Sequence, residues 1–315
     1  MTASHDNLAI GIDAGGSKTT AWLGRMDASG DNPVAVGHAG TGNLRAVGFD
    51  AATASIREAI DAAFTAAGLP GLPVASVCLS AAGAGRAAEQ QELRQWVETQ
   101  QIAKNVRVTH DAEPVLAAAS ANEVGIALIS GTGSLAWGRN SAGEVRRTGG
   151  WGYLFGDEGS GYAISLAGLK AAARAIDGRG EATRLVEAWS QRLRINACTD
   201  LIEHIYGSEL SRSEIACLAK VVLEVAKEGD AVARQILSDA ADQLAEMVTS
   251  LASQLQFPTH EFPLGMAGGV LVNQPAFRSA VSELIGVSAG CVTVVPEPVA
   301  GALKLAIALV RGAAR

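Results

Sequence analysis

The feature that most constrains this chain is a strand pattern near its start that two adjacent glycines interrupt. Residues 8–12 alternate large apolar with small side chains, which predicts a strand with at least one buried face. Gly15 and Gly16 can then adopt positive φ in a tight turn, and an apolar run resumes at residues 20–23. The chain is therefore predicted to open with a β-hairpin whose turn directs backbone N–H groups toward an anion.

The residues of this turn favour a phosphate as the anion. Ser17, Lys18 and Thr19 add donors, and Asp13 places a carboxylate at the strand end. A carboxylate beside a phosphate requires a cation between them, so Asp13 is a candidate Mg²⁺ ligand. A Walker A loop is rejected because one residue too many precedes Lys18, and because a strand rather than a helix is predicted to follow. A plain glycine-rich turn remains the alternative.

The composition limits the classes of protein and partner. With 315 residues, 48% hydrophobic residues and 36 glycines, the chain is long enough for two lobes of a compact α/β protein. Its net charge of −7 disfavours nucleic acid as a partner. The four cysteines form no CxxC pair, which favours a reducing cytoplasm over a zinc or iron–sulfur protein. We expect neither a signal peptide nor a membrane span.

A second candidate acid follows a later strand. Residues 74–79 and 106–109 are predicted to be strands, and the second of them leads directly to Asp111. A helix is predicted from Glu113, with Pro114 suited to its first turn. Asp111 therefore lies where a strand ends and a helix begins, the place at which α/β sheets carry their chemistry.

The second half of the chain begins with another hairpin of the same build. An apolar strand at residues 124–129 enters the loop Gly131-Thr132-Gly133-Ser134, and residues 135–138 resume as a strand. Two such glycine loops facing each other would bind a polyphosphate from both sides.

A glycine-rich stretch, residues 149–161, comes next. It combines six glycines and three aromatic residues with two adjacent acids, Asp157 and Glu158. Glycines allow a ligand to approach the backbone, Trp151 can cover a sugar ring, and the acids can accept hydrogen bonds from sugar hydroxyls. These features favour a binding loop over a packing loop.

The remainder is predicted to be helical scaffold followed by a return of the sheet. Helical periodicity continues almost to residue 256 and includes one helix over residues 211–225 that opens with a capping box. A strand is predicted from Glu261. Gly268 and Gly269 after it either let an adenine ring approach the backbone or form an ordinary strand-to-helix turn.

Four motifs occur in an order that resembles a known family. They are Asp13-Ala-Gly-Gly-Ser-Lys-Thr, Gly131-Thr132-Gly133-Ser134, Gly150-Trp151-Gly-Tyr-Leu-Phe-Gly-Asp157-Glu158-Gly-Ser and Ala267-Gly268-Gly269-Val270. Over essentially its full length, the chain resembles the N-acetylglucosamine kinase group of the benzoyl-CoA-reductase-type ATPases. The resemblance implies a two-lobed, actin-like (ribonuclease H-like) α/β fold, with a mixed five-stranded sheet in each lobe and an ATP cleft between the lobes. It places residues 1–120 in the first lobe, residues 298–315 back on that lobe, and residues 121–297 in the second.

The resemblance also implies an activity. This activity is the ATP- and Mg²⁺-dependent phosphorylation of an amino-sugar hydroxyl, with N-acetylglucosamine converted to its 6-phosphate. Glucosamine and N-acetylmuramic acid are alternative acceptors, and a non-sugar ATPase or sensor is the alternative function. The presence of both Asp13 and Asp111 disfavours the sensor. A cytoplasmic homodimer that binds neither nucleic acid nor membrane is implied as well.

Site residues carry over by position. Asp111 resembles the catalytic carboxylate that accepts the proton of the attacking hydroxyl, and Asp13 would hold Mg²⁺ through water. The implied ATP- and phosphate-binding residues are Gly15, Gly16, Ser17, Lys18, Thr19, Gly131, Thr132, Gly133, Ser134, Gly268, Gly269 and Asn273. The implied sugar-binding residues are Asn43, Asp111, Thr132, Gly150, Trp151, Gly152, Asp157 and Glu158.

Overall fold

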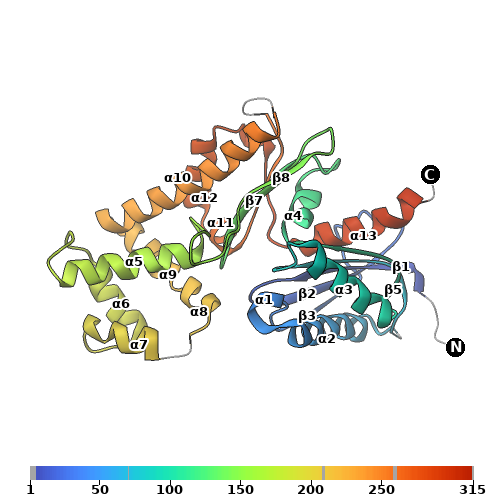
Figure 1. Ribbon diagram of the computed structural model, residues 1–315, viewed down its shortest axis with the longest axis horizontal. Coiled ribbons are helices and arrows are strands. Elements are labelled where there is room, and N and C mark those ends of the chain that lie inside the picture. Colours follow the sequence, from blue (N-terminus) through green and yellow to red (C-terminus); the bar gives the residue numbers. More distant parts are fainter. Residues whose placement is uncertain (1–4, 70, 208–209, 258–260, 314–315) are drawn as a thin grey trace. The chain divides into compact units, whose positions relative to one another are not determined.

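The chain forms two compact units (Figure 1). The computed structural model describes residues 5–69, 71–207, 210–257 and 261–313. Unit 1 extends to Ala127 and includes the segment from Val295 onward, whereas unit 2 comprises Leu128–Val294. In the described part of the chain, no helix is both long and apolar enough to cross a membrane.

Unit 1 contains a mixed five-stranded sheet in the order β3-β2-β1-β4-β5. Its strands are β1 His5–Ala14, β2 Thr19–Arg25, β3 Ala35–Ala39, β4 Val74–Ala81 and β5 Ala103–Thr109. The first three strands pair antiparallel, whereas β4 and β5 run parallel to β1. The predicted opening hairpin is confirmed. Because the glycine turn leads into β2 and not into a helix, the rejection of a Walker A loop is confirmed too.

Helices cover both faces of this sheet (Figure 1). The helices of unit 1 are α1 Leu44–Val47, α2 Phe49–Ala67, α3 Ala87–Thr99, α4 Ala112–Ala119 and α13 Val299–Ala313. On β1, the large residues Ile10 and Ile12 face α2 and α3, and the small Ala9 faces α13. At Gly11, an added Cβ would lie 2.3 Å from the backbone N of Leu303 in α13. The alternation of large and small residues in β1 therefore allows α13 to pack directly on the strand.

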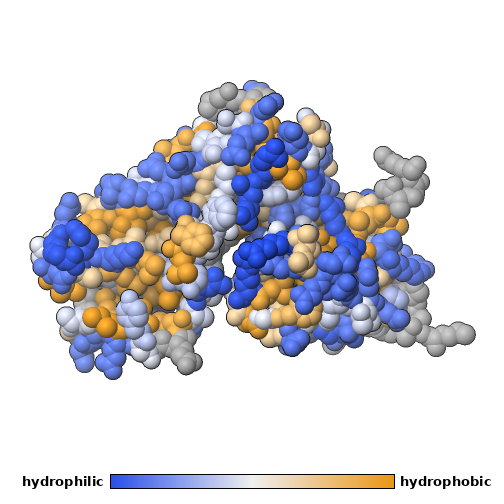
Figure 2. Space-filling view, viewed as in Figure 1, coloured by the Kyte–Doolittle hydropathy of each residue, from blue (hydrophilic) through white to orange (hydrophobic). Residues whose placement is uncertain are grey.

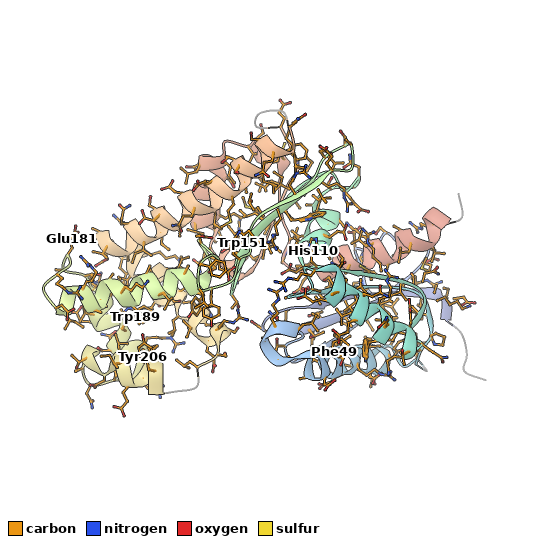
Figure 3. All side chains as sticks on the ribbon, in the orientation of Figure 1. Phe49, His110, Trp151, Glu181, Trp189 and Tyr206 are labelled. Carbon is orange, nitrogen blue, oxygen red and sulfur yellow. The ribbon has the colours of Figure 1, made fainter. Side chains whose placement is uncertain are left out.

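Unit 2 has its own five-stranded sheet in the order β10-β9-β6-β7-β8. Its strands are β6 Gly125–Ser130, β7 Ser134–Arg139, β8 Val145–Gly149, β9 Leu264–Ala267 and β10 Val292–Val294. The helices are α5 Gly161–Ile176, α6 Leu185–Leu193, α7 Leu201–Gly207, α8 Arg212–Cys217, α9 Ala219–Lys227, α10 Ala231–Gln254, α11 Gly269–Asn273 and α12 Pro275–Ile285. Trp189 of α6 is fully buried, and its indole N–H donates to the Gly168 carbonyl of α5 at 3.3 Å (Figure 3).

The predicted α/β class with two mixed five-stranded sheets is confirmed, and two predicted elements are corrected. Residues 211–225 form two helices, α8 and α9, because the hydrogen bonds at Leu218 tighten to the i−3 pattern with Ile215 and Val221. Strand β9 begins at Leu264, not at Glu261, since Pro263 cannot donate a hydrogen bond to a neighbouring strand.

Candidate functional site

The carboxyl ends of three parallel strands in unit 1 bring both predicted acids to one edge of the sheet. Asp13, Ser80 and Thr109 are direct neighbours across β1, β4 and β5. The Ser80 hydroxyl donates a hydrogen bond to Asp13 Oδ1 at 3.2 Å. Asp111 follows β5 at the start of α4, where its side chain does not cap the helix. This edge is where α/β sheets generally bind ligands.

The environment of Asp13 disfavours its ionised form. Burial, and next the negative charge of Asp111, raise the pKa of Asp13 from 3.8 to about 7. The Ser80 hydrogen bond and the Lys18 charge act in the lowering direction, and Glu297 adds a further raising effect. A carboxylate whose ionised form is disfavoured in this way is a group that a divalent cation would stabilise in that form.

A partly buried ion pair holds the strand end that carries Asp111. Glu113, in the first turn of α4, is only 7% exposed. Its Oε1 accepts a hydrogen bond from Arg107 Nη2 at 2.8 Å, and its Oε2 accepts one from the Thr109 hydroxyl at 2.6 Å. Arg107 also lies 3.6 Å from Glu123. Because Thr109 and Glu113 flank Asp111, the bond between them fixes the backbone on which the acid is carried.

The glycine turn between β1 and β2 is closed by its own backbone. The Gly15 N–H donates to the Lys18 carbonyl at 2.9 Å, so it stabilises the turn and is not free for an anion. Gly16 is half-exposed and Ser17 is exposed. The Lys18 ammonium lies 3.5 Å from Glu297.

One hydroxyl at this turn is buried without a partner. Thr19 Oγ1 makes no hydrogen bond within the described residues, although the side chain is fully buried. At Gly42, an added Cβ would lie 2.7 Å from this oxygen, so only glycine leaves the space in front of it open. An unpaired buried hydroxyl costs free energy, and a ligand acceptor reaching this space would reduce that cost.

The loop of Asn43 is tied to the same turn. The Thr41 hydroxyl donates to the Gly15 carbonyl at 3.1 Å. Asn43 is the N-cap of α1, and its Oδ1 accepts a hydrogen bond from the Arg45 N–H at 3.0 Å. Because the cap uses the side-chain oxygen, Asn43 would recognise a ligand through its Nδ2 donor.

In unit 2, the second glycine loop is held by the acidic loop. The Ser134 N–H donates to Asp157 Oδ1 at 3.4 Å, and the Ser134 hydroxyl donates to the Glu158 carbonyl at 2.6 Å. Asp157 is 8% exposed and has a φ of 58°. Burial raises the pKa of Asp157, against the lowering effects of the Ser134 N–H and of Arg212. A Cβ on Gly133 would lie 2.9 Å from Asp157 Oδ2, so this contact requires glycine.

A third glycine loop meets the second. Gly268 has a φ of 89°, and a Cβ there would lie 2.3 Å from the Ser130 carbonyl oxygen. A Cβ added to Gly131 would lie 3.7 Å from Gly268 Cα and 3.7 Å from Gly269 N. The half-exposed Thr132 follows Gly131. Asn273 Nδ2 donates to the Gly269 carbonyl at 2.9 Å. Unit 2 therefore brings the predicted phosphate loop, the acidic loop and the predicted adenine loop together.

The aromatic part of the glycine-rich stretch is exposed. Trp151 is 63% exposed, and Figure 3 shows it on the loop that follows β8. The glycines on either side of it, Gly150 and Gly152, have φ of 68° and 91°. The Arg147 guanidinium lies 5.3 Å from the centroid of the Trp151 ring. An exposed indole beside glycines offers an apolar platform with open backbone around it.

These residues fit Mg²⁺ and a nucleotide. Among the described residues, no three His, Cys, Asp or Glu side chains cluster closely enough to hold a metal. Mg²⁺ usually takes one or two protein carboxylates and completes its shell with water and phosphate oxygens. Asp13, with Asp111 beside it, could supply such a set, and bound Mg²⁺ would lower the raised pKa of Asp13. For a nucleotide, Gly131 and Gly269 leave accessible backbone, since a Cβ added to either would meet no atom closer than 3.7 Å.

The sequence analysis missed four residues at these sites. Ser80, Glu113 and Glu297 act on Asp13 or on the strand that carries Asp111. Arg212 acts on Asp157. Ser80 ends a predicted strand and Glu113 follows the predicted strand–helix junction, so their positions carried a signal. Glu297 and Arg212 approach from elements distant in sequence, and no local pattern marks them.

The chain is similar to known proteins over most of its length. The model of the BadF/BadG/BcrA/BcrD ATPase family matches residues 10–306. The chain belongs to this family. A relative from Clostridium acetobutylicum, named N-acetylmuramic acid/N-acetylglucosamine kinase, is 34% identical over 264 residues, which cover 84% of this chain and 85% of the relative. A second relative, the N-acetyl-D-glucosamine kinase of Dictyostelium discoideum, is 30% identical over 290 residues, covering 88% and 90% of the two chains.

Solved structures show the same fold as this member of the BadF/BadG/BcrA/BcrD family. A Chromobacterium violaceum protein, provisionally named an N-acetylglucosamine kinase, superposes with a TM-score of 0.74 at 24% identity, covering 95% of this chain and 99% of the other. A glucokinase from Streptomyces griseus superposes with a TM-score of 0.54 at 16% identity, covering 97% and 100%. These likenesses establish the predicted actin-like ATPase fold.

Proposed function

We propose that this chain is an ATP-dependent kinase that phosphorylates a hydroxyl of an amino sugar. N-acetylglucosamine, phosphorylated at its 6-hydroxyl, is the first acceptor to test, and N-acetylmuramic acid and glucosamine are the alternatives. The observation that carries the proposal is the pair of acids Asp13 and Asp111 at the carboxyl ends of β1 and β5, with the pKa of Asp13 raised to about 7. The relatives named for these two N-acetylated sugars support the choice of acceptor.

In this proposal the two acids of unit 1 have different roles. Asp111 accepts the proton of the attacking sugar hydroxyl and orients that hydroxyl. Asp13 would hold Mg²⁺ through water, and Mg²⁺ would neutralise the charge that develops on the transferred phosphoryl group. Glu113 keeps the backbone at Asp111 in place through its bond to Thr109. Since phosphoryl transfer depends mainly on positioning, such support is part of the catalytic design.

The loops of unit 2 bind the two substrates in the same proposal. Gly131–Ser134 offers backbone donors to phosphate, and Gly268–Gly269 offers an open backbone to the adenine. Trp151 covers a face of the sugar, and Asp157 accepts hydrogen bonds from its hydroxyls. Thr132 contributes a polar contact from unit 2. From unit 1, Asn43 contributes another, and Lys18 contributes a positive charge at the hairpin turn.

The proposal also covers the two lobes, the cellular location and the oligomeric state. We infer that units 1 and 2 are the two lobes expected for the family. The segment from Val295 onward then belongs to the first lobe. A cytoplasmic location is favoured by four cysteines without a CxxC pair, which suits a reducing compartment. A homodimer is inferred from the likeness to the family.

The proposal is tested by measuring ADP release with Mg²⁺, ATP and one sugar at a time. The panel is N-acetylglucosamine, glucosamine, N-acetylmuramic acid, N-acetylmannosamine and glucose. We expect turnover on an N-acetylated amino sugar, and Asp111→Asn should reduce kcat by about 10²–10⁴-fold while nucleotide affinity is kept. ATP binding without sugar-dependent turnover in the intact chain would refute the kinase and favour a sensor or a non-sugar ATPase.

A further inference from the structure

Two loops of unit 2 are joined by hydrogen bonds. The phosphate loop, residues 130–134, connects β6 to β7, and the acidic loop, residues 157–161, leads into α5. Ser134 links the two loops, since its N–H donates to Asp157 Oδ1 at 3.4 Å and its hydroxyl donates to the Glu158 carbonyl at 2.6 Å. Both donors of Ser134 are therefore directed at the acidic loop.

Two further hydrogen bonds extend this link. The Ser130 hydroxyl donates to the Gly159 carbonyl at 2.8 Å, and the Gly161 N–H donates to the Gly131 carbonyl at 2.8 Å. Ser130 is fully buried and Ser134 is 3% exposed, so water competes little for these bonds. The face of unit 2 seen in Figure 2 shows apolar patches beside hydrophilic ones, whereas the two serines that link the loops are buried.

The packing between the two loops leaves little free space. A Cβ on Gly133 would lie 2.9 Å from Asp157 Oδ2, and one on Gly161 would lie 3.1 Å from the Gly131 carbonyl oxygen. Asp157 has a φ of 58°, a conformation that a residue other than glycine keeps only where its surroundings hold it. A displacement of one loop therefore changes the contacts that hold the other.

The proposed function gives these two loops different ligands. The phosphate loop would bind the nucleotide, and Asp157 of the acidic loop would accept hydrogen bonds from the sugar. We propose that Ser134 is a positioning residue that couples the two substrates, so that each raises the affinity of the chain for the other. This inference rests on the proposed function, since that function assigns the two ligands.

The coupling arises from the ordering of the loops. Hydrogen bonds from sugar hydroxyls would hold the Asp157 carboxylate, and with it the Ser134 N–H, in one arrangement. A nucleotide that binds next meets a phosphate loop that is already ordered, so its binding costs less conformational entropy. By thermodynamic linkage, the nucleotide strengthens the binding of the sugar by the same factor. Tight nucleotide binding then coincides with the presence of an acceptor, which limits phosphoryl transfer to water.

Two rival explanations give Ser134 no role in coupling. If Ser134 only stabilises the phosphate loop, its loss would weaken nucleotide binding equally with and without sugar. If the sugar and the transferred phosphate touch directly, the substrates would be coupled even without Ser134. The Kd of the nucleotide without sugar divided by its Kd with sugar, which we call the coupling ratio, separates these explanations when it is measured in Ser134→Ala.

The test is calorimetric titration of the full chain with Mg²⁺ and the non-hydrolysable β,γ-imido analogue of ATP. It is done with and without a saturating acceptor, which is N-acetylglucosamine or whichever sugar of the turnover panel is phosphorylated. In the unaltered chain the coupling ratio should be about 5 or more. Ser134→Ala and Ser130→Ala each remove one side-chain bond between the loops and should lower the ratio toward equal affinities.

The matched control is Ser165→Ala. Ser165 is as fully buried as Ser130, and its hydroxyl also donates to a carbonyl at 2.8 Å, that of Gly161. This bond runs along α5 and does not join the two loops, so the control should keep the coupling ratio of the unaltered chain.

The other outcomes refute the inference. One is an affinity for the analogue that sugar does not change, and another is a coupling ratio that stays the same in both Ser134→Ala and Ser130→Ala. If turnover is retained in a chain without coupling, this inference fails and the proposed function does not.

If no sugar is phosphorylated, the proposed function fails, and amide hydrogen exchange decides this inference instead. The analogue should then slow exchange at residues 157–161 in the unaltered chain and in Ser165→Ala, but not in Ser134→Ala. No slowing, or equal slowing in all three proteins, would refute the coupling.

Discussion

Replacing Asp13 by Asn should make the nucleotide-free protein more stable at alkaline pH while removing its activity. The Asp13 carboxyl has its pKa raised from 3.8 to about 7 by burial and by Asp111. Between these two pH values the folded protein keeps a proton that the unfolded chain has lost, so stability falls as the pH rises through this interval. Asn cannot ionise, and it keeps an oxygen that can accept the Ser80 hydrogen bond. The variant therefore escapes the destabilisation without losing this contact.

The size of the expected change in stability follows from the shift in the pKa of Asp13. A rise of about three pKa units corresponds to about 4 kcal/mol of lost stability above pH 7, of which about 2.5 kcal/mol arises between about pH 5 and about pH 8. Asp13 is partly exposed, so solvent screening reduces this value. We expect the variant to gain about 1 kcal/mol on the wild type over that interval.

The assay is urea denaturation of both proteins at about pH 5 and about pH 8, without nucleotide or divalent cation. Two further variants test the direction in which neighbouring groups shift the pKa of Asp13. Asp111→Asn removes a charge that raises the pKa of Asp13 and should weaken the pH dependence, whereas Ser80→Ala removes a hydrogen bond that lowers it and should strengthen the dependence. A stability difference between wild type and Asp13→Asn that stays constant, or shrinks, toward alkaline pH would refute the reasoning.

Three more results are expected. Glu113→Gln should reduce the free energy of unfolding by about 3 kcal/mol, because it leaves the partly buried Arg107 without its main acidic partner. Asp61→Asn, in an exposed ion pair, should reduce it by less than about 1 kcal/mol. Equal losses for the two variants in urea denaturation would contradict this prediction. Gly268→Ala should lower nucleotide affinity and should destabilise the protein more than Gly178→Ala. Both glycines have positive φ, but only a Cβ at Gly268 would meet a carbonyl oxygen, that of Ser130. Equal losses of stability for the two variants in calorimetry would argue against this prediction. ATP with Mg²⁺ at about 100 times its Kd should stabilise the wild type by about 2.7 kcal/mol in thermal unfolding but should leave the stability of Asp13→Asn nearly unchanged. An equal gain in stability for both proteins would show that Asp13 does not bind the metal.

Elements with strong local patterns could be predicted from the sequence. The alternation at residues 8–12 and the two following glycines are local signals, so the hairpin of β1 and β2 is found where it was expected. Helix α2 ends at Gly68, which adopts the left-handed conformation that a glycine at a helix end indicates. Asp111 was predicted to lie at a strand–helix junction, and it does. In each case a few neighbouring residues decide the conformation.

Features that depend on distant contacts could not be predicted in this way. The break at Leu218 falls inside an uninterrupted helical pattern, because both short helices bury apolar residues against other parts of unit 2. The Arg107–Glu113 pair joins a strand to the next helix, and periodicity does not say which polar side chains meet. Glu297 approaches Lys18 across almost the whole length of the chain. Sequence patterns locate the edge where chemistry occurs, whereas the electrostatic balance at that edge requires the tertiary structure.

The position of α13 has a consequence for how the protein is made. The apolar side of this helix covers a face of the unit 1 sheet, around Ala9 and Cys78, yet the ribosome adds α13 only after all of unit 2. During synthesis the sheet of unit 1 must therefore wait with one face uncovered while unit 2 emerges and folds. Exposed apolar surface of this kind is prone to aggregation and is a target for chaperones. Unit 2 can complete its core from a continuous segment, so it is the part able to fold first.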